Sequence, residues 1–224
     1  MATKAGKKQR RIPGWLEMVL LLGLALVLSV GIKTFFVQMF FVPSESMEPL
    51  FIKDDRILVE KVSYWNGDVE RGDVIVFEDP GSWLGEQPEL GPVQKALSTV
   101  GLYPTGGHLV KRVIGVGGDR VACCDRKGRI TVNGVALDES EYLPEGVVPS
   151  AREFDVKVPE GHLWMMGDNR GNSEDSRFHQ QLPGSGTVPV DRVVGKVWAI
   201  VWPVGRFERI ERPETFEQKA LDAG

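Results

Sequence analysis

One stretch constrains the fold of this chain more than any other. The run from Trp15 to Ile32 is mostly apolar, with Glu17 as its only charged residue, and as a helix at 1.5 Å per residue it would be about 27 Å long. That length nearly matches the roughly 30 Å hydrocarbon core of a bilayer. A cleaved signal peptide is one alternative, but it needs small residues at a cleavage site, and Lys33 is followed by TFFVQMFFVP. A buried core helix is another, which a run apolar on every face and preceded by a basic cluster disfavours. The pattern predicts a retained transmembrane anchor over residues 12–33.

The charge is distributed unevenly around this run. Residues 1–11 contain five Lys or Arg and no acidic residue, and removing those charges from the net charge of −4 leaves −9 on the remainder. Cations beside a membrane segment keep their end cytoplasmic. We therefore expect residues 1–11 to be a cytoplasmic tail, with the domain after the anchor on the extracytoplasmic face of the cell membrane. An acidic domain also argues against nucleic acid as the partner.

After Lys33 the pattern becomes that of a β protein. Short runs rich in Val and Ile, bounded by Gly, Pro, Asp or Asn, predict strands, and TVNGVAL carries an Asn-Gly hairpin turn. The fold class is therefore mainly β: one N-terminal transmembrane helix followed by an all-β domain with a curled, partly closed antiparallel sheet. We place this domain at residues 34–207 and expect residues 208–224 to be a charged, frayed tail. The strand-like runs are DDRILVEKV, GDVIVFEDP, HLVKRVIGV, RITVNGVAL and KVWAIVWPV.

Residues 80–107 interrupt the strands with a long insertion punctuated by Gly and Pro. Val93, Ala96, Leu97 and Val100 have helical spacing, which predicts two turns of helix. The insertion either touches the membrane, with Trp83 and Tyr103 as interface anchors, or packs on its own domain.

Cysteine and histidine carry little signal. Cys123 and Cys124 are adjacent, where a disulfide would close a strained ring, so we expect two partly buried thiols in a strand. The chain has three scattered His residues and no His-x-x-x-His, so we expect no metal and no cofactor.

Three segments carry residues suited to hydrolytic chemistry. FFVPSESMEPLF places Ser44 and Ser46 directly after the anchor, where they are either turn residues or a nucleophile. Lys111 lies within HLVKRVIGV, and it is either an exposed lysine on an edge strand or a buried lysine whose pKa is lowered by desolvation. A buried neutral lysine can act as a general base. The third segment, MMGDNRGNSEDSRF, has the composition of a solvated loop.

Taken together, PSESMEP, RGDVIVF, KRVIGVGGD and GDNRGNSEDSR, in this order behind an anchor, resemble the conserved boxes of the type I signal peptidases. The resemblance covers most of residues 40–177, and TVPVDRVVGKVWAIVWPVGR is similar to the family's final strands. Members of this family are membrane-bound serine proteases with a Ser/Lys dyad. They cut signal peptides from exported preproteins after small-x-small sites. The short interval from Lys111 to Asp168 implies only a small cap, over residues 120–160.

The resemblance also implies roles for individual residues. Ser46 matches the nucleophile, Lys111 the general base, Ser44 the oxyanion-hole hydroxyl and Ser173 the hydroxyl that orients the lysine. Two further groups match the ion pairs that support the site and the apolar pockets for small substrate side chains. The supporting residues are Arg112, Asp168, Arg170, Asp175 and Arg177, and the pocket residues are Phe40, Val42, Pro43, Met47, Leu109 and Val110.

The expected partners are therefore the signal peptides of exported preproteins and membrane lipid, with no metal and no nucleic acid. Two alternatives remain. A related Ser/Lys self-cleaving repressor would carry a DNA-binding domain where this chain has its apolar run. A tethered β-domain without activity would lack the serine or the lysine, and both are present.

Overall fold

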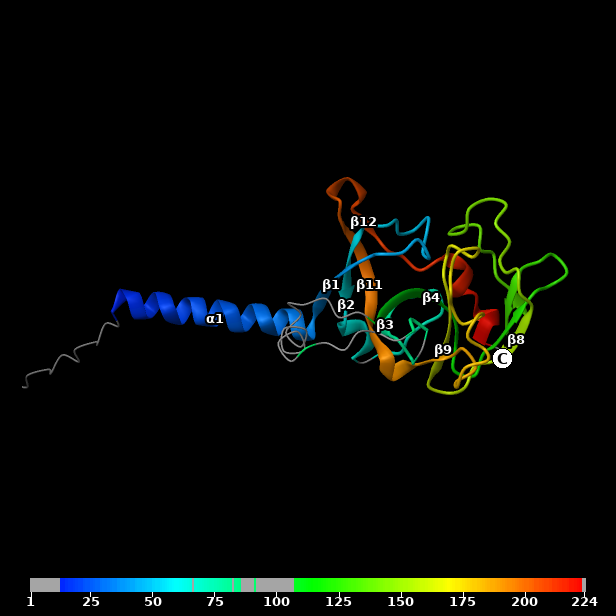
Figure 1. Cartoon of the computed structure of the whole chain (residues 1–224), viewed down its shortest axis with the longest axis horizontal. Coiled ribbons are helices and arrows are strands. Elements are labelled where there is room, and N and C mark those ends of the chain that lie inside the picture. The colour runs from blue at the N-terminus through cyan, green and yellow to red at the C-terminus, as the bar shows by residue number, and fades with distance from the viewer. Residues whose placement is uncertain (1–12, 66, 82, 86–90, 92–106, 223–224) are drawn as a thin grey trace, which may run out of the picture.

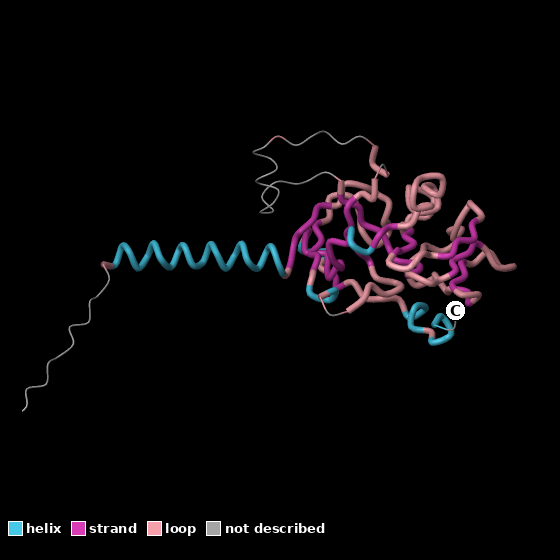
Figure 2. Tube along the Cα trace, turned by 90° about the horizontal axis from the view of Figure 1, so that it is seen from below, coloured by secondary structure: helices cyan, strands magenta, loops and turns pink. Residues whose placement is uncertain are grey.

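A computed structural model describes residues 13–65, 67–81, 83–85, 91 and 107–222. Its first element is the helix α1 (Gly14–Phe35), which follows Pro13, a residue suited to a helix start because it has no N–H to leave unpaired. Residues 14–32 have a mean hydropathy of 2.3, and none of this stretch is buried against the rest of the protein. Figures 1 and 2 both show α1 extending alone from the β structure. The helix is thus long and apolar enough to cross a membrane, as the sequence predicts.

The predicted strands form an antiparallel sheet in the order β1-β2-β11-β3-β4-β9-β10, with β12 paired to β11. The five runs singled out in the sequence all contain strands, and HLVKRVIGV is β4 from end to end. The sheet is curled: β1 and β4 are separated by three strands, yet the rings of Phe40 and His108 lie 5.3 Å apart. The mainly β class with a curled antiparallel sheet is confirmed. The strands are β1 (Val37–Phe41), β2 (Arg56–Glu60), β3 (Val74–Glu78), β4 (His108–Val116), β9 (His162–Met166), β10 (Val188–Pro189), β11 (Val193–Trp202) and β12 (Glu208–Arg209).

A second, smaller sheet has the order β7-β6-β5-β8. Asn133 and Gly134 both have positive φ between β6 and β7, as a tight hairpin turn with these residues requires. The strands of this sheet are β5 (Arg120–Cys123), β6 (Ile130–Val132), β7 (Val135–Ala136) and β8 (Phe154–Lys157), and the short 3₁₀ helices of the chain are η1 (Val62–Tyr64), η2 (Val190–Arg192), η3 (Val204–Arg206), η4 (Glu214–Glu217) and η5 (Lys219–Asp222).

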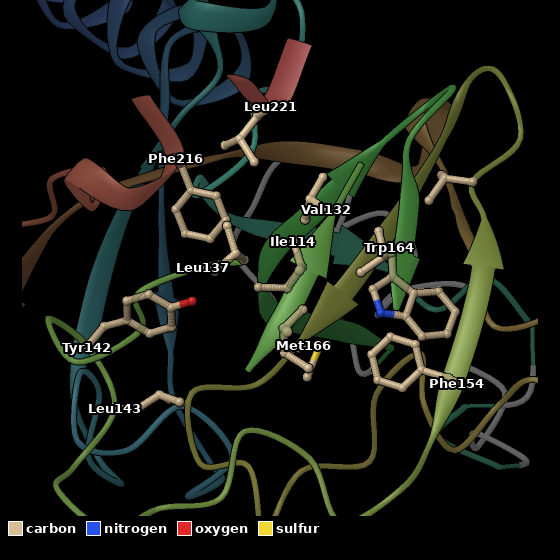
Figure 3. Close-up of a cluster of buried hydrophobic side chains, with 13 residues drawn as sticks. Ile114, Val132, Leu137, Tyr142, Leu143, Phe154, Trp164, Met166, Phe216 and Leu221 are labelled. Atoms are coloured by element: carbon tan, nitrogen blue, oxygen red, sulfur yellow. The ribbon is translucent and has the colours of Figure 1, made fainter. Parts of the chain in front are cut away.

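The main sheet is covered on both faces. Val74 and Val76 of β3 enter one buried cluster, while Ile75 and Phe77 enter another, because successive side chains of a strand point to opposite faces. This explains the unbroken apolar run VIVF. A third cluster joins the two sheets and includes Ile114 and the fully buried Trp164 (Figure 3). Each fully buried side chain of this size contributes about 1.5–3 kcal/mol.

The C-terminal segment corrects one expectation. Residues 208–222 are not a frayed tail, because Phe216 and Leu221 are buried in the third cluster. Figure 3 shows both side chains directed toward Ile114 and Leu137. The sequence shows a charged segment, whereas its two apolar side chains decide where it packs.

The position of Trp83 distinguishes the two alternatives for this part of the insertion. It is buried, and its ring stacks on His179 with 4.4 Å between centroids, so it is not a membrane anchor. Its burial favours the alternative in which this part of the insertion packs on its own domain. Tyr103 and the helix predicted at Val93–Val100 lie outside the described residues.

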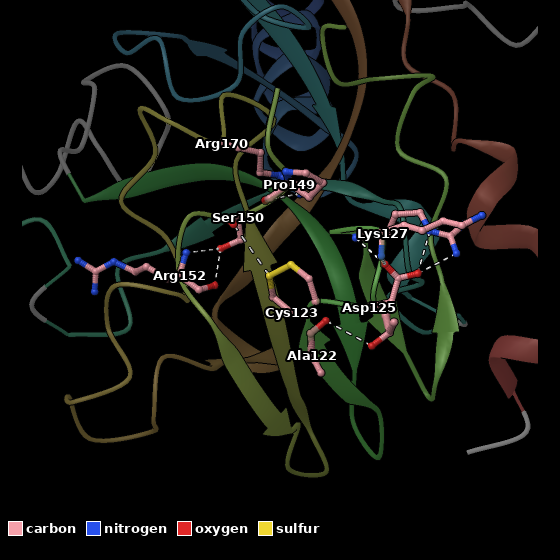
Figure 4. The surroundings of a disulfide bond; sticks show 11 residues. Ala122, Cys123, Asp125, Lys127, Pro149, Ser150, Arg152 and Arg170 are labelled. Carbon is pink, nitrogen blue, oxygen red and sulfur yellow. Dashed lines mark hydrogen bonds and ion pairs between the residues drawn. A yellow bond between two sulfur atoms is a disulfide. The ribbon is translucent and has the colours of Figure 1, made fainter. Parts of the chain in front are cut away.

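The cysteines correct a second expectation. Cys123 and Cys124 are joined by a disulfide rather than carrying free thiols, and the peptide bond between them is cis. No residue pattern indicates that peptide geometry, in which the two Cα atoms lie 2.9 Å apart. Figure 4 shows the disulfide beside Ser150, whose carbonyl oxygen lies 4.0 Å from the Cys123 sulfur.

Candidate active site

The candidate nucleophile lies on an irregular segment, residues 42–51, which we call the serine loop. It lies between β1 and β2 in the chain and is held by backbone hydrogen bonds. The Val42 N–H donates to the carbonyl of Asp55, and the Phe51 N–H donates to the carbonyl of Met47. Met47 and Phe51 are buried in the cluster beneath the loop, which leaves Ser44 exposed and Ser46 half-buried.

Lys111 reaches the serine loop from β4. Its Nζ lies 2.6 Å from Ser46 Oγ, although the two residues are 65 positions apart in the chain. Of the two alternatives for Lys111, the structure has the buried one, with 3% of the residue exposed. Desolvation lowers the pKa of Lys111 from 10.5 to about 8, against the opposing pull of the Asp175 and Asp168 carboxylates. A lysine with this pKa has an appreciable neutral fraction near neutral pH, so it can accept a proton from a hydroxyl in contact with it.

Ser44 also contacts Ser46, with 3.2 Å between the two Oγ atoms. Within the described part of the chain, the Ser46 N–H donates no hydrogen bond. The hydroxyl of Ser44 and this N–H are therefore two donors close to the nucleophile, which is the arrangement that stabilises a developing oxyanion.

Residues 167–178, which we call the Asp–Arg loop, are held by buried ion pairs. Asp168 accepts two hydrogen bonds from the guanidinium of Arg112, at 2.9 and 2.6 Å, and both side chains are buried. Asp175 accepts two from Arg177, both at 2.8 Å, and also accepts from the Gly167 N–H. The sequence-predicted supporting residues thus lie together behind Lys111. Buried charges of this kind are tolerated only when each is paired.

Two contacts in this network were not predicted. Arg170 donates to Glu139 at 2.6 Å, and the Tyr142 hydroxyl donates to the same carboxylate oxygen at 2.6 Å. Glu139 lies in the 120–160 segment, for which no individual role was predicted. Because its partner is 31 positions away, no pattern in the neighbouring sequence indicates the pair. Gly167 is a further residue of the site for which the sequence predicted no role. A Cβ at this position would overlap the Ser46 carbonyl oxygen and the Ser173 hydroxyl.

Ser173 is placed close to the site but without its expected bond. Its side chain is buried, and its Oγ has no hydrogen-bond partner among the described residues. The orientation of Lys111 by Ser173 therefore remains a prediction.

The predicted pocket residues separate into two sets. Phe40, Val42, Met47 and Val110 meet in the cluster beneath the serine loop, whereas Leu109 packs against the cluster on the opposite face. Pro43 is exposed beside Ser44. Among the described residues, no group of three His, Cys, Asp or Glu is arranged to hold a metal ion.

A serine hydroxyl in contact with a buried lysine amine, on a curled β-sheet behind an apolar helix, defines a class of site equipped for nucleophilic hydrolysis. Comparison with known proteins agrees with this class. The sequence model of the family described as "Signal peptidase, peptidase S26" matches residues 15–202. The chain therefore belongs to the signal peptidase family S26.

Curated relatives are similar over most of their length. "Signal peptidase I" of Mycobacterium tuberculosis (strain CDC 1551 / Oshkosh) is 42% identical over 217 residues, which cover 85% of this chain and 74% of the relative. "Probable signal peptidase I" of Mycobacterium leprae (strain TN) is 38% identical over 240 residues, 92% of this chain and 82% of the relative. A solved signal peptidase I from Enterococcus faecalis V583 is 24% identical with a TM-score of 0.38, over 58% of this chain and 97% of the other.

Proposed function

We propose that this protein is a type I signal peptidase, a membrane-bound serine endopeptidase that removes N-terminal signal peptides from exported preproteins. In this proposal Ser46 is the nucleophile, Lys111 is the general base, and cleavage follows small-x-small sites. The observation that carries the proposal is the contact of 2.6 Å between Ser46 Oγ and the buried Lys111 Nζ. Family membership supports the substrate class.

The chemistry proceeds through an acyl-enzyme. Neutral Lys111 takes the Ser46 hydroxyl proton while Oγ bonds to the scissile carbonyl carbon. The carbonyl oxygen becomes an oxyanion, which accepts hydrogen bonds from the Ser46 N–H and the Ser44 hydroxyl. The C–N bond then breaks as the Lys111 ammonium returns the proton to the leaving amine. A water molecule, deprotonated by Lys111, attacks the ester carbonyl. The ester C–O bond then breaks, the Lys111 ammonium returns the proton to Ser46 Oγ, and the signal peptide leaves as a carboxylic acid.

The sheet offers an edge on which an extended substrate can lie. Among the described residues, β1 is the terminal strand of its sheet and pairs only with β2. β4 pairs with β9 from Arg112 onward, so within the same part of the chain residues 109–111 pair with a strand on the β3 side only. A substrate strand added between β1 and this part of β4 would reach Ser46, and such strand addition is a common mode of peptide binding. The apolar cluster of Phe40, Val42, Met47 and Val110 lies beneath that path and would favour small side chains.

The proposal predicts a pH profile. Because the pKa of Lys111 is about 8, kcat/KM for a preprotein should rise with pH through that value as the lysine loses its proton. Purified protein in detergent is incubated with a preprotein that carries an Ala-x-Ala site, and the new N-terminus is sequenced. Ser46→Ala and Lys111→Ala should abolish cleavage, whereas Ser140→Ala and Lys157→Ala, at exposed positions, should not. Full activity in either of the first two variants contradicts the dyad.

We also propose that α1 spans the membrane with residues 1–11 in the cytoplasm. Apolar side chains exposed near the end of α1 and at the β11–β12 turn would then contact lipid, among them Phe36, Phe41, Trp202, Val204 and Phe207. Protease added outside spheroplasts should digest the β-domain and spare an N-terminal tag. In nanodiscs with brominated lipid, Trp202→Phe should reduce quenching of tryptophan fluorescence, whereas replacing the buried Trp164 by Phe should not. Protection of the β-domain from external protease would contradict this topology.

A further inference from the structure

The serine loop has no regular secondary structure at Ser46, so other contacts must fix the direction of its peptide groups. Two of them come from one residue of the Asp–Arg loop. The Asn169 N–H donates to the carbonyl of Ser46 at 3.1 Å, and the Asn169 side chain donates through Nδ2 to the carbonyl of Glu45 at 3.0 Å. Asn169 therefore holds both peptide groups that flank the α-carbon of Ser46.

The bond to Glu45 has a consequence for the oxyanion site. The carbonyl of Glu45 and the N–H of Ser46 belong to the same peptide group, which is planar and, in its trans form, points its C=O and N–H in opposite directions. Any bond that fixes the direction of the Glu45 carbonyl thus fixes the direction of the Ser46 N–H. A hydrogen bond to the C=O also polarises the group and makes its N–H a stronger donor.

The Asn169 side chain can hold the Glu45 carbonyl in a fixed direction because the residues on both sides of Asn169 are themselves held by ion pairs. Asp168 is paired with Arg112, and Arg170 is paired with Glu139, all with buried side chains. The Glu48 N–H also donates to the Glu45 carbonyl at 3.1 Å, but it belongs to the serine loop and would move with it. Asn169 connects the loop to a different and rigid part of the fold.

On the basis of the proposed function, we propose that Asn169 is a positioning residue, whose side-chain amide aims the Ser46 N–H at the oxyanion of the reacting carbonyl. It touches neither the substrate nor the general base. Its contribution belongs to the transition state, because the oxyanion forms only there.

Asn169→Ala tests the proposal, since it removes the bond to Glu45 and keeps the backbone bond to Ser46. We expect kcat for preprotein cleavage to fall about 10- to 100-fold, part of the loss seen when an oxyanion donor is removed outright, with KM changed less than about twofold. The pH at which activity rises should stay that of the wild type, because Lys111 is untouched. A purely structural role would instead lower the thermal midpoint and raise KM.

A pair of inhibitors distinguishes a loss of oxyanion stabilisation from a general distortion of the substrate site. A peptide aldehyde with a small-x-small sequence adds Ser46 Oγ to its carbonyl carbon, which converts C=O to C–O⁻ in the oxyanion site, whereas the matching peptide alcohol cannot. Asn169→Ala should weaken the aldehyde about 10-fold or more and leave the alcohol unchanged. Equal weakening of both, or a shifted pH limb, overturns the proposal.

The matched control is Asn172→Ala. Among the described residues, the Asn172 side chain donates to the exposed Glu45 carboxylate alone, at 3.3 Å, and Asn172→Ala keeps the backbone bond from Asn172 to the Asn169 carbonyl. Its loss should therefore change kcat by less than about twofold. If Asn169→Ala does not fold, the isosteric Asn169→Asp, which also lacks the donor, must show the same loss of kcat. Wild-type cleavage abolished by Ser46→Ala establishes the proposed function separately, so wild-type kinetics for Asn169→Ala would overturn only this inference.

Discussion

A buried lysine that can be charged should make the protein less stable than it would be with an apolar residue there. The pKa of Lys111 is lowered from 10.5 to about 8, and at about 1.4 kcal/mol per pH unit this corresponds to roughly 3 kcal/mol. Below about pH 8 the lysine is charged in both the folded and the unfolded state, and the folded state bears the full cost. Between pH 8 and 10.5 only the unfolded state keeps the proton, so stability rises with pH across that window.

Lys111→Met removes the charge and keeps much of the volume. We expect the variant to be more stable than the wild type by about 3 kcal/mol near pH 7, and this difference to disappear above about pH 10.5. The same variant should have no peptidase activity. A catalytic group is expected to show this combination, in which the residue lowers stability and is required for activity.

The assay is urea unfolding of the full chain in detergent, followed by tryptophan fluorescence, because the fully buried Trp164 reports on the β-domain. Lys157→Met is the control, since Lys157 is exposed on β8 and should give no pH-dependent gain. Equal or lower stability of Lys111→Met near neutral pH would refute the reasoning, because Lys111 would then not be desolvated.

The remaining predictions concern the support of the site and the core. Gly167→Ala should lower kcat about 100-fold or more, because its Cβ would displace the Ser46 carbonyl. Gly171→Ala, with open space around the new Cβ, should keep its activity. Normal activity of Gly167→Ala would contradict this packing. Asp168→Ala should lower the free energy of unfolding in urea by about 3–5 kcal/mol, because it leaves Arg112 buried and unpaired. Asp155→Ala removes an exposed ion pair with Arg120 and should leave the unfolding midpoint unchanged. Similar midpoints for the two variants would show that burial does not determine the contribution of these ion pairs to stability. Phe216→Ala should cost about 3 kcal/mol, and a loss below about 1 kcal/mol would mean that the C-terminal segment is not part of the core.

The sequence predicted the elements that depend on local pattern. The Asn-Gly turn at residues 133–134 and the β4 strand follow from residue types within a few positions of each other. No local pattern relates Ser46 to Lys111, which are 65 positions apart in the chain. The sequence pointed to this pair through the family resemblance, and the contact in the structure agrees with it.

What the sequence did not predict depends on distant partners or on peptide geometry. Glu139 pairs with Arg170 across 31 positions, and Trp83 stacks on His179, which directly follows the Asp–Arg loop. The cis bond between Cys123 and Cys124, which accompanies their disulfide, has no compositional signature. Asn169 lies within a recognised box, yet its role follows only from which carbonyl its amide meets.

The packing of Phe216 and Leu221 has a consequence for biogenesis. Both complete a core whose other members begin at Ile114, so this core cannot close until residue 221 has joined the rest of the domain. If the β-domain lies outside the cell, a nascent copy must pass through the export channel to that point before it can fold. A peptidase with this fold would therefore become active only after its own translocation, so preproteins still in the cytoplasm would not be exposed to its activity.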